Sequence, residues 1–71
     1  MERLVTFMIG ADPPPRLDRA LARDAPEDAD LSRSRLARLV ADGAVHVNGQ
    51  QVTDVRAKVD EGDEIDITIP E

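Results

Sequence analysis

Residues 31–49 read LSRSRLARLVADGAVHVNG and contain the clearest structural signals in the chain. Ser32 is a favourable helix N-cap, and Leu31 before it is positioned to pack against Leu36 as a hydrophobic staple. Gly43 is the residue type expected in the left-handed conformation that ends a helix. The buried stripe of this helix is expected to consist of Leu36, Leu39 and Val40. The stretch therefore predicts an amphipathic helix between Ser32 and Gly43.

The same stretch continues into a hairpin. Val45 and Val47 alternate with a histidine, and Asn48-Gly49 is a preferred pair for the two central positions of a type I′ turn. A two-residue turn of this kind places Val45 opposite Val52 on one face of the ladder. We therefore expect two antiparallel strands directly after the helix.

The residues before this stretch predict a strand and a first helix. Apolar residues alternate with other residues at Val5, Phe7 and Ile9, which is typical of a strand with one buried face. The prolines at 13–15 interrupt that strand because proline cannot donate to a ladder. A helical stripe follows at Leu17, Ala20 and Leu21, and Pro26 is expected to end this helix near Asp24. The acidic residues 27–30 are expected to form a loop.

The residues after the hairpin predict further extended structure. Val55, Ala57 and Val59 alternate and are expected to form one more extended segment. A turn is expected at 61–63, followed by a final strand with Ile65, Ile67 and Ile69 on its buried face. The order of elements indicates an α+β fold, with both helices packed against a small antiparallel sheet. The 71 residues are sufficient for a single domain, residues 1–71.

Composition excludes several classes of protein. There is no cysteine, which excludes disulfides and thiolate metal sites, and Phe7 is the one aromatic residue. RNA-binding folds that stack bases on exposed aromatic rings are therefore disfavoured. No apolar run is long enough to span a membrane, and the first residues do not resemble a signal peptide. A cytoplasmic protein without membrane association is expected.

Charge is unevenly distributed along the chain. The net charge is −6, but arginines outnumber acids between Arg16 and Arg38. The arginines there are Arg16, Arg19, Arg23, Arg33, Arg35 and Arg38, and the acids are Asp18, Asp24, Glu27, Asp28 and Asp30. Acids dominate from Asp54 to Glu71, where Arg56 and Lys58 are the basic residues. Such a chain can present a basic face to an anionic partner despite its acidic total, although two unrelated solvated surfaces would give the same composition.

Ser32-Arg33-Ser34-Arg35 at the start of the second helix favours anion binding. The helix dipole disfavours cations in a first turn, at a cost of about 0.3–1 kcal/mol each. Free N–H groups at a helix N-terminus bind phosphate, and guanidinium groups strengthen such a site. The alternative is that tertiary packing stabilises the helix and the arginines are merely exposed. Arg38, on the same outer flank as Arg35, is also expected to pair with Asp42 four residues later.

Four motifs in register resemble the S4 RNA-binding domain. They are Arg16-Leu17-Asp18-Arg19-Ala20-Leu21, Ser32-Arg33-Ser34, Gly43-Ala44-Val45-His46-Val47-Asn48-Gly49, and Lys58 with Gly62-Asp63-Glu64-Ile65. The resemblance covers roughly residues 16–69. The strand ahead of these motifs further resembles the N-terminal domain of RluA/RluD-type ribosomal RNA pseudouridine synthases.

The resemblance implies an αL fold, in which two helices and a hairpin present a basic surface to structured, ribosomal RNA. The N-terminal strand is an addition to that fold. By position it implies RNA contacts from Arg16, Ser32, Arg33, Ser34, Arg35, Arg38 and Lys58. Arg19 joins them if the two helices pack so that the first helix shares the outer flank of Arg35 and Arg38. The chain is expected to be a monomer without cofactor. The resemblance implies a tether to a catalytic domain that would hold the catalytic aspartate, so no catalytic residue is expected here.

Two other functions remain open at this point. The acidic C-terminal strand could dock a basic protein while the arginines contact only solvent, or the chain could be a free-standing S4 protein acting on the ribosome or on transfer RNA. An enzymatic function has little support, since no nucleophile–base pair, metal set or glycine-rich phosphate loop is present. His46 is the single histidine, and the acids after Val59 lack the spacing of a calcium loop.

Overall fold

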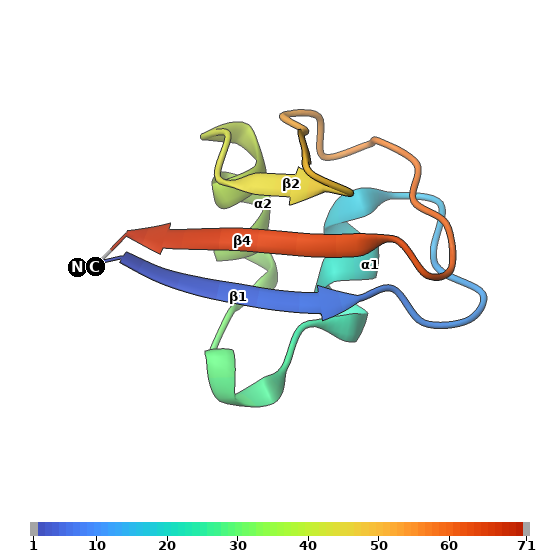
Figure 1. The fold of residues 1–71 in the computed structure, drawn as a ribbon, viewed down its shortest axis with the longest axis horizontal. Coiled ribbons are helices and arrows are strands. Elements are labelled where there is room, and N and C mark those ends of the chain that lie inside the picture. The colour runs from blue at the N-terminus through green and yellow to red at the C-terminus, as the bar shows by residue number, and fades with distance from the viewer. Residues whose placement is uncertain (1, 71) are drawn as a thin grey trace.

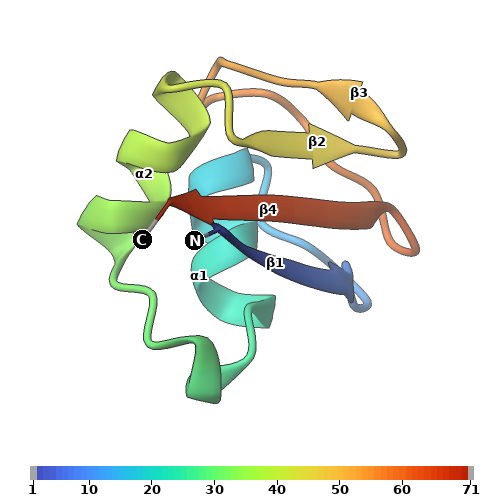
Figure 2. The ribbon, with the colours of Figure 1, turned by 60° about the vertical axis from the view of Figure 1, so that its left-hand side comes forward.

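The computed structural model describes residues 2–70, with the backbone alone for Asp28. Its elements are β1 (Glu2–Met8), α1 (Leu17–Asp24), the 3₁₀ helix η1 (Glu27–Ala29), α2 (Arg33–Ala41), β2 (Val45–Val47), β3 (Gln50–Gln51) and β4 (Glu64–Pro70). Figures 1 and 2 show α1 and α2 on one face of the sheet, with the other face open. The predicted α+β class is confirmed.

The four strands form one antiparallel sheet in the order β1-β4-β2-β3. The last strand of the chain therefore lies between the first strand and the hairpin. Ile67 of β4 is opposite Val5 on one side and Val45 on the other, so three buried side chains form a row. This pairing joins the two ends of the chain into the sheet, and β1 forms one of its edges.

A single hydrophobic core lies between the helices and the sheet. Its buried members are Val5, Ile9, Leu17, Ala20, Leu21, Ala29, Leu36, Leu39, Val40, Val45, Val59, Ile65, Ile67 and Ile69. The stripes predicted for both helices and for the final strand are all in this set. Within residues 2–70, neither helix has the length and apolar character needed to cross a membrane.

The termination of α2 follows the local sequence signals. Gly43 has a φ of 81°, and the N–H groups of Gly43 and Ala44 donate to the carbonyls of Val40 and Leu39. These two bonds form a Schellman motif, which satisfies carbonyls that the end of a helix leaves free. In the hairpin turn, Asn48 and Gly49 both have positive φ, as the type I′ prediction requires.

The prediction of an extended segment at Val55, Ala57 and Val59 is wrong. The carbonyls of Val55 and Ala57 instead accept hydrogen bonds from the N–H groups of Asp18 (3.2 Å) and Leu17 (2.8 Å). The first turn of a helix leaves these donors without intrahelical acceptors. The segment therefore caps α1 with its backbone and does not pair in the sheet, while Val59 is buried.

The loop predicted at residues 27–30 connects α1 to α2 and contains one short turn of regular structure. Residues Glu27–Ala29 form one 3₁₀ turn, and Asp30 follows in the left-handed conformation with a φ of 54°. Ala29 is buried in the core, so an apolar contact holds this acidic segment against the helices. The segment thereby lies close to the start of α2.

Candidate nucleic-acid interface

The start of α2 presents four consecutive exposed residues, Ser32 to Arg35. The Ser32 hydroxyl accepts a hydrogen bond from the Arg35 N–H at 3.1 Å, which confirms the predicted N-cap. The N–H groups of Arg33 and Ser34 lie in the first turn, where they have no intrahelical acceptor, and they point out of the helix end. An exposed set of donors therefore lies beside two guanidinium groups.

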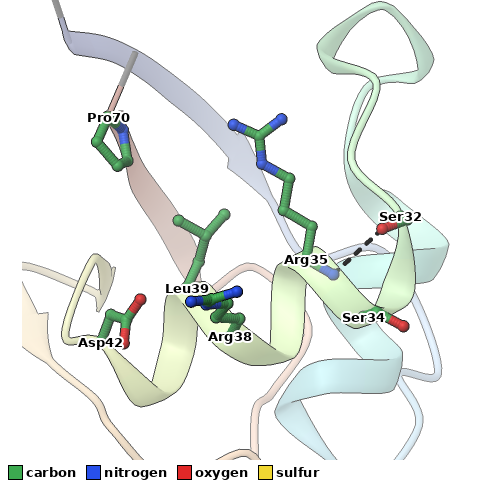
Figure 3. A pocket seen from close by; sticks show the side chains of 7 residues that line it. All are labelled: Ser32, Ser34, Arg35, Arg38, Leu39, Asp42 and Pro70. Carbon is green, nitrogen blue, oxygen red and sulfur yellow. Dashed lines mark hydrogen bonds between the residues drawn. The ribbon is translucent and has the colours of Figure 1, made fainter.

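A shallow hollow of about 500 Å³ runs along the outer side of α2. It is lined by Ser32, Ser34, Arg35, Arg38, Leu39, Asp42 and Pro70, and we call it the α2 hollow. Figure 3 shows the Leu39 side chain pointing to the side of α2 on which Pro70 lies, with Arg35 next to it and Arg38 below it in this view. Leu39 is 5% exposed, so it closes the hollow from below while both arginines stay exposed to solvent.

Arg33 lies in a different hollow. Arg19, Ala22, Arg23 and Arg33 line a space of about 490 Å³ between α1 and α2, here called the interhelical hollow. The structure thus brings Arg19 together with Arg33, and Arg35 together with Arg38. Arg19 was expected to share the outer flank of Arg35 and Arg38, but it lines a hollow with Arg33 and not with those two residues. The cause is the way α1 packs on α2, which the sequence did not specify.

Two arginines, the N-cap residue Arg16 and Arg23 of α1, are paired with carboxylates. Arg16 donates to both oxygens of Asp18 at 3.2 Å. Arg23 donates to both oxygens of Asp24, at 2.9 and 3.0 Å, and to the carbonyl of Asp12 at 2.7 Å. The hydrogen bonds between Arg23 and Asp24 raise the pKa of the Arg23 guanidinium and lower the pKa of the Asp24 carboxyl. Both cations are therefore already partly compensated within the protein.

The arginines of α2 are not compensated in this way. Within residues 2–70, no ion pair is formed by Arg33, Arg35 or Arg38. The ion pair expected between Arg38 and Asp42 is not formed among the described residues. Figure 3 shows both side chains on one face of α2 without a bond between them. The charge of α2 is available to a ligand.

Lys58 is exposed and lies in neither of these hollows. It follows Ala57, whose carbonyl bonds to the first residue of α1, and that residue follows Arg16. Arg16 and Lys58 therefore flank the same backbone contact at the N-terminal end of α1. They form a basic position separate from the two hollows.

The open sheet face carries a different set of side chains. His46 is opposite Asp66, and the Thr6 hydroxyl donates to Asp66 at 2.8 Å. Leu4 and Met8 of β1 are 65% and 62% exposed on this face. Among the residues that the structure describes, no group of three or more histidine or acidic side chains is arranged to hold a metal ion.

The comparison with protein families decides the identity of this fold. A model of the S4 domain matches residues 29–65, just over half of the chain. The chain belongs to the S4 domain family. An S4 domain is an RNA-binding module and not a catalytic one. The match includes all of α2 and the hairpin.

Three curated relatives of this S4 domain are pseudouridine synthases. An uncharacterized RNA pseudouridine synthase of Aquifex aeolicus is 43% identical over 56 residues, which are 79% of this chain and 17% of the relative. The ribosomal large subunit pseudouridine synthase D of Pasteurella multocida is 48% identical over 54 residues, 76% of this chain and 16% of that protein. The enzyme of the same name from Vibrio parahaemolyticus is 52% identical over 50 residues, 70% of this chain and 14% of its own length. The S4 domain thus spans about one-sixth of these relatives.

Sequence reasoning missed three residues that line the α2 hollow of this S4 domain. Leu39 was assigned to the core, and Asp42 was assigned to an ion pair. The spacing of Arg35, Leu39 and Asp42 places them on one helix face and could have grouped them. Pro70 comes from a strand 28 residues after Asp42, and no local pattern could have found it.

Proposed function

We propose that this S4 domain docks structured ribosomal RNA through α2, and that it serves as the RNA-binding module of a pseudouridine synthase. The RNA-binding residues would be Ser32, Ser34, Arg35 and Arg38 at the α2 hollow, Arg19 and Arg33 at the interhelical hollow, and Arg16 and Lys58 beside the start of α1. The observation that supports this proposal most is the exposure of Arg35 and Arg38 on one helix face without carboxylate partners in the described residues.

The physical basis is phosphate binding at a helix N-terminus. Arginines in the first turn are unfavourable for the free helix because they oppose its dipole. A bound phosphate makes the contribution of these arginines favourable, since it accepts hydrogen bonds from the free N–H groups and from the guanidinium groups at once. Two arginines one turn apart can contact successive phosphates of a strand. Because exposed aromatic rings are lacking, recognition would depend on RNA shape and phosphates.

The names of the relatives support ribosomal RNA as the target. A module that spans about one-sixth of such an enzyme would act by positioning the remainder on its substrate. Weak binding by the S4 domain alone would be sufficient for this role, because a tether converts a second contact into an intramolecular one.

The open sheet face supports one competing function, a protein-docking role. Leu4 and Met8 are exposed there beside Glu64 and Asp66. An apolar and acidic surface suits a partner with basic and apolar side chains. This function requires no phosphate contact by α2, so a test of RNA binding separates it from the first proposal.

Titration of ribosomal RNA stem-loops at two salt concentrations tests the proposal. The comparison is between the unmodified protein, Arg35→Glu, Arg38→Glu, and Arg56→Glu as a charge-matched control. Arg56 is exposed and lines neither hollow. Binding is expected to weaken with salt, and to fall about tenfold or more in the α2 variants but not in the control. Equal losses in all three variants would show a non-specific charge effect and would contradict the assignment to α2.

A further inference from the structure

The α2 hollow changes in chemical character along its length. Arg35, Leu39 and Asp42 lie four and three residues apart and therefore share one face of α2. The hollow is cationic beside Arg35 and Arg38, apolar over Leu39 and Pro70, and anionic at Asp42 (Figure 3). A surface that bound only phosphates would be expected to remain cationic throughout.

The Asp42 carboxylate is free to contact a ligand. Asp42 caps the C-terminus of α2 through its backbone N–H, which donates to the Arg38 carbonyl at 2.9 Å. Its side chain is exposed, and within residues 2–70 it forms no hydrogen bond or ion pair. The side chain is therefore not needed to hold the helix end.

A carboxylate in this position constrains what can lie over it. It repels phosphate and can only accept hydrogen bonds. RNA offers such an acceptor the ribose 2′-OH, the imino N–H groups of guanine and uracil, and the exocyclic amines of adenine, cytosine and guanine, and the amines are the donors that a carboxylate reads from the base edge. In a paired A-form helix one N–H of each amine bonds to the opposite strand, and the amines of adenine and cytosine lie in a deep, narrow major groove that side chains do not reach, whereas an unpaired base presents its amine to a protein.

The neighbouring surface indicates that the cationic part of the α2 hollow ends at Asp42. A second hollow adjoins the first through Leu39, Asp42 and Pro70, and its other lining residues include Glu2 and His46. Arginine and lysine do not line this second hollow. An RNA backbone held by Arg35 and Arg38 would thus be repelled beyond Asp42, which favours a base and not a phosphate at this end.

The dimensions and floor of the α2 hollow suit a base. Its volume of about 500 Å³ falls in the range of small-ligand sites, roughly 300–1,000 Å³. Pro70, which is exposed, and the small exposed part of Leu39 provide apolar surface for the face of a ring. The arginines lie within one to two helical turns of Asp42.

We propose that the α2 hollow receives one unpaired nucleotide of the RNA, and that Asp42 accepts a hydrogen bond from an exocyclic amine of its base. Arg35 and Arg38 hold the flanking phosphates. This inference rests on the proposed RNA-binding function and assigns to Asp42 the selection of the nucleotide.

The test uses RNA hairpins that carry one unpaired nucleotide, moved along the stem, and differ by a single amine. The matched bases are adenine and purine, cytosine and pyrimidin-2-one, and guanine and hypoxanthine. At the preferred position, removal of the amine is expected to weaken binding by the unmodified protein about tenfold, in line with a hydrogen bond to a charged acceptor. In Asp42→Ala the ratio of affinities for the two RNAs of the same pair, with and without the amine, is expected to fall below about threefold.

The ratio within a pair is the informative quantity, because loss of an acid strengthens binding to every RNA. Glu61→Ala provides the control for that general effect, since Glu61 is exposed in a distant turn. Equal affinity within all pairs and for a fully paired hairpin would overturn the inference while leaving the RNA-binding function in place. A ratio that persists in Asp42→Ala would assign the amine contact elsewhere. Absence of binding to every hairpin would overturn both proposals.

Discussion

The Ser32 hydroxyl lies 3.1 Å from the backbone nitrogen of Arg35 and accepts its hydrogen bond. This bond determines where α2 begins, and so it determines which residues of the Ser-Arg-Ser-Arg run lie in the first turn. Arg33 is directed to the interhelical hollow and Arg35 to the α2 hollow. The cap thus has a structural role, while Ser34 in the same turn makes no such bond within the described residues.

Ser32→Ala is therefore expected to destabilise the protein by about 1 kcal/mol, in the range found for N-cap replacements. The free energy of unfolding, measured with urea, reports this loss. Ser34→Ala is the matched control, and its unfolding free energy should change by less than about 0.5 kcal/mol. Equal destabilisation by both replacements would contradict the distinct role of Ser32.

Arg35→Gln is expected to reduce the salt dependence of RNA binding. The slope of log K against log salt is negative, and each phosphate contact that is lost reduces its magnitude by about 0.7–0.9. Affinities measured by titration at four or more salt concentrations give this slope. Arg56→Gln should leave the slope unchanged, and an unchanged slope in Arg35→Gln would exclude a phosphate contact by that residue.

Removal of acids near the start of α2 is expected to strengthen RNA binding. Glu27 and Asp30 line a hollow that also contains Ser32 and Arg35, so their charges act on the same phosphates. Glu27→Gln and Asp30→Asn should each raise affinity about twofold to fivefold at low salt, and less at high salt because of screening. Asparagine tolerates the left-handed conformation of residue 30, so the fold should be retained. Glu61→Gln serves as the distant control.

The elements predicted correctly are those with local signals. Ser32, Gly43 and Asn48-Gly49 each determine a cap or a turn within a few residues, and the structure confirms all of them. The segment at Val55 and Ala57 was predicted wrongly because its carbonyls bond to α1, nearly forty residues earlier in the chain. No periodicity encodes that contact. The division of the arginines between two hollows likewise depends on helix packing, which is a long-range property.

The contact between Arg23 and Asp24 predicts a pH dependence of stability. Its hydrogen bonds lower the pKa of Asp24 in the folded protein, and the carboxylate also accepts from the Gly10 N–H at 3.1 Å. A depressed folded pKa contributes stability above the unfolded pKa, which is near 3.9, and this contribution is lost as pH falls through the folded value. The difference in unfolding free energy between the unmodified protein and Asp24→Asn should therefore be largest at neutral pH and shrink below pH ~4. A difference that is independent of pH would contradict this account.

Asn48 is expected to serve the fold and not RNA contact. Its side chain accepts from the Glu64 N–H at 2.9 Å and donates to Asp63 at 3.1 Å, which joins the hairpin to the start of β4. Its φ of 52° also favours asparagine or glycine. Asn48→Ala should lower the unfolding free energy by about 2 kcal/mol, because it combines lost hydrogen bonds with backbone strain. Asn48→Gly should cost less, since it relieves the strain while losing the same bonds. RNA affinity corrected for the folded fraction should be unchanged in both variants, and a specific loss of affinity in Asn48→Gly would instead make Asn48 part of the RNA interface.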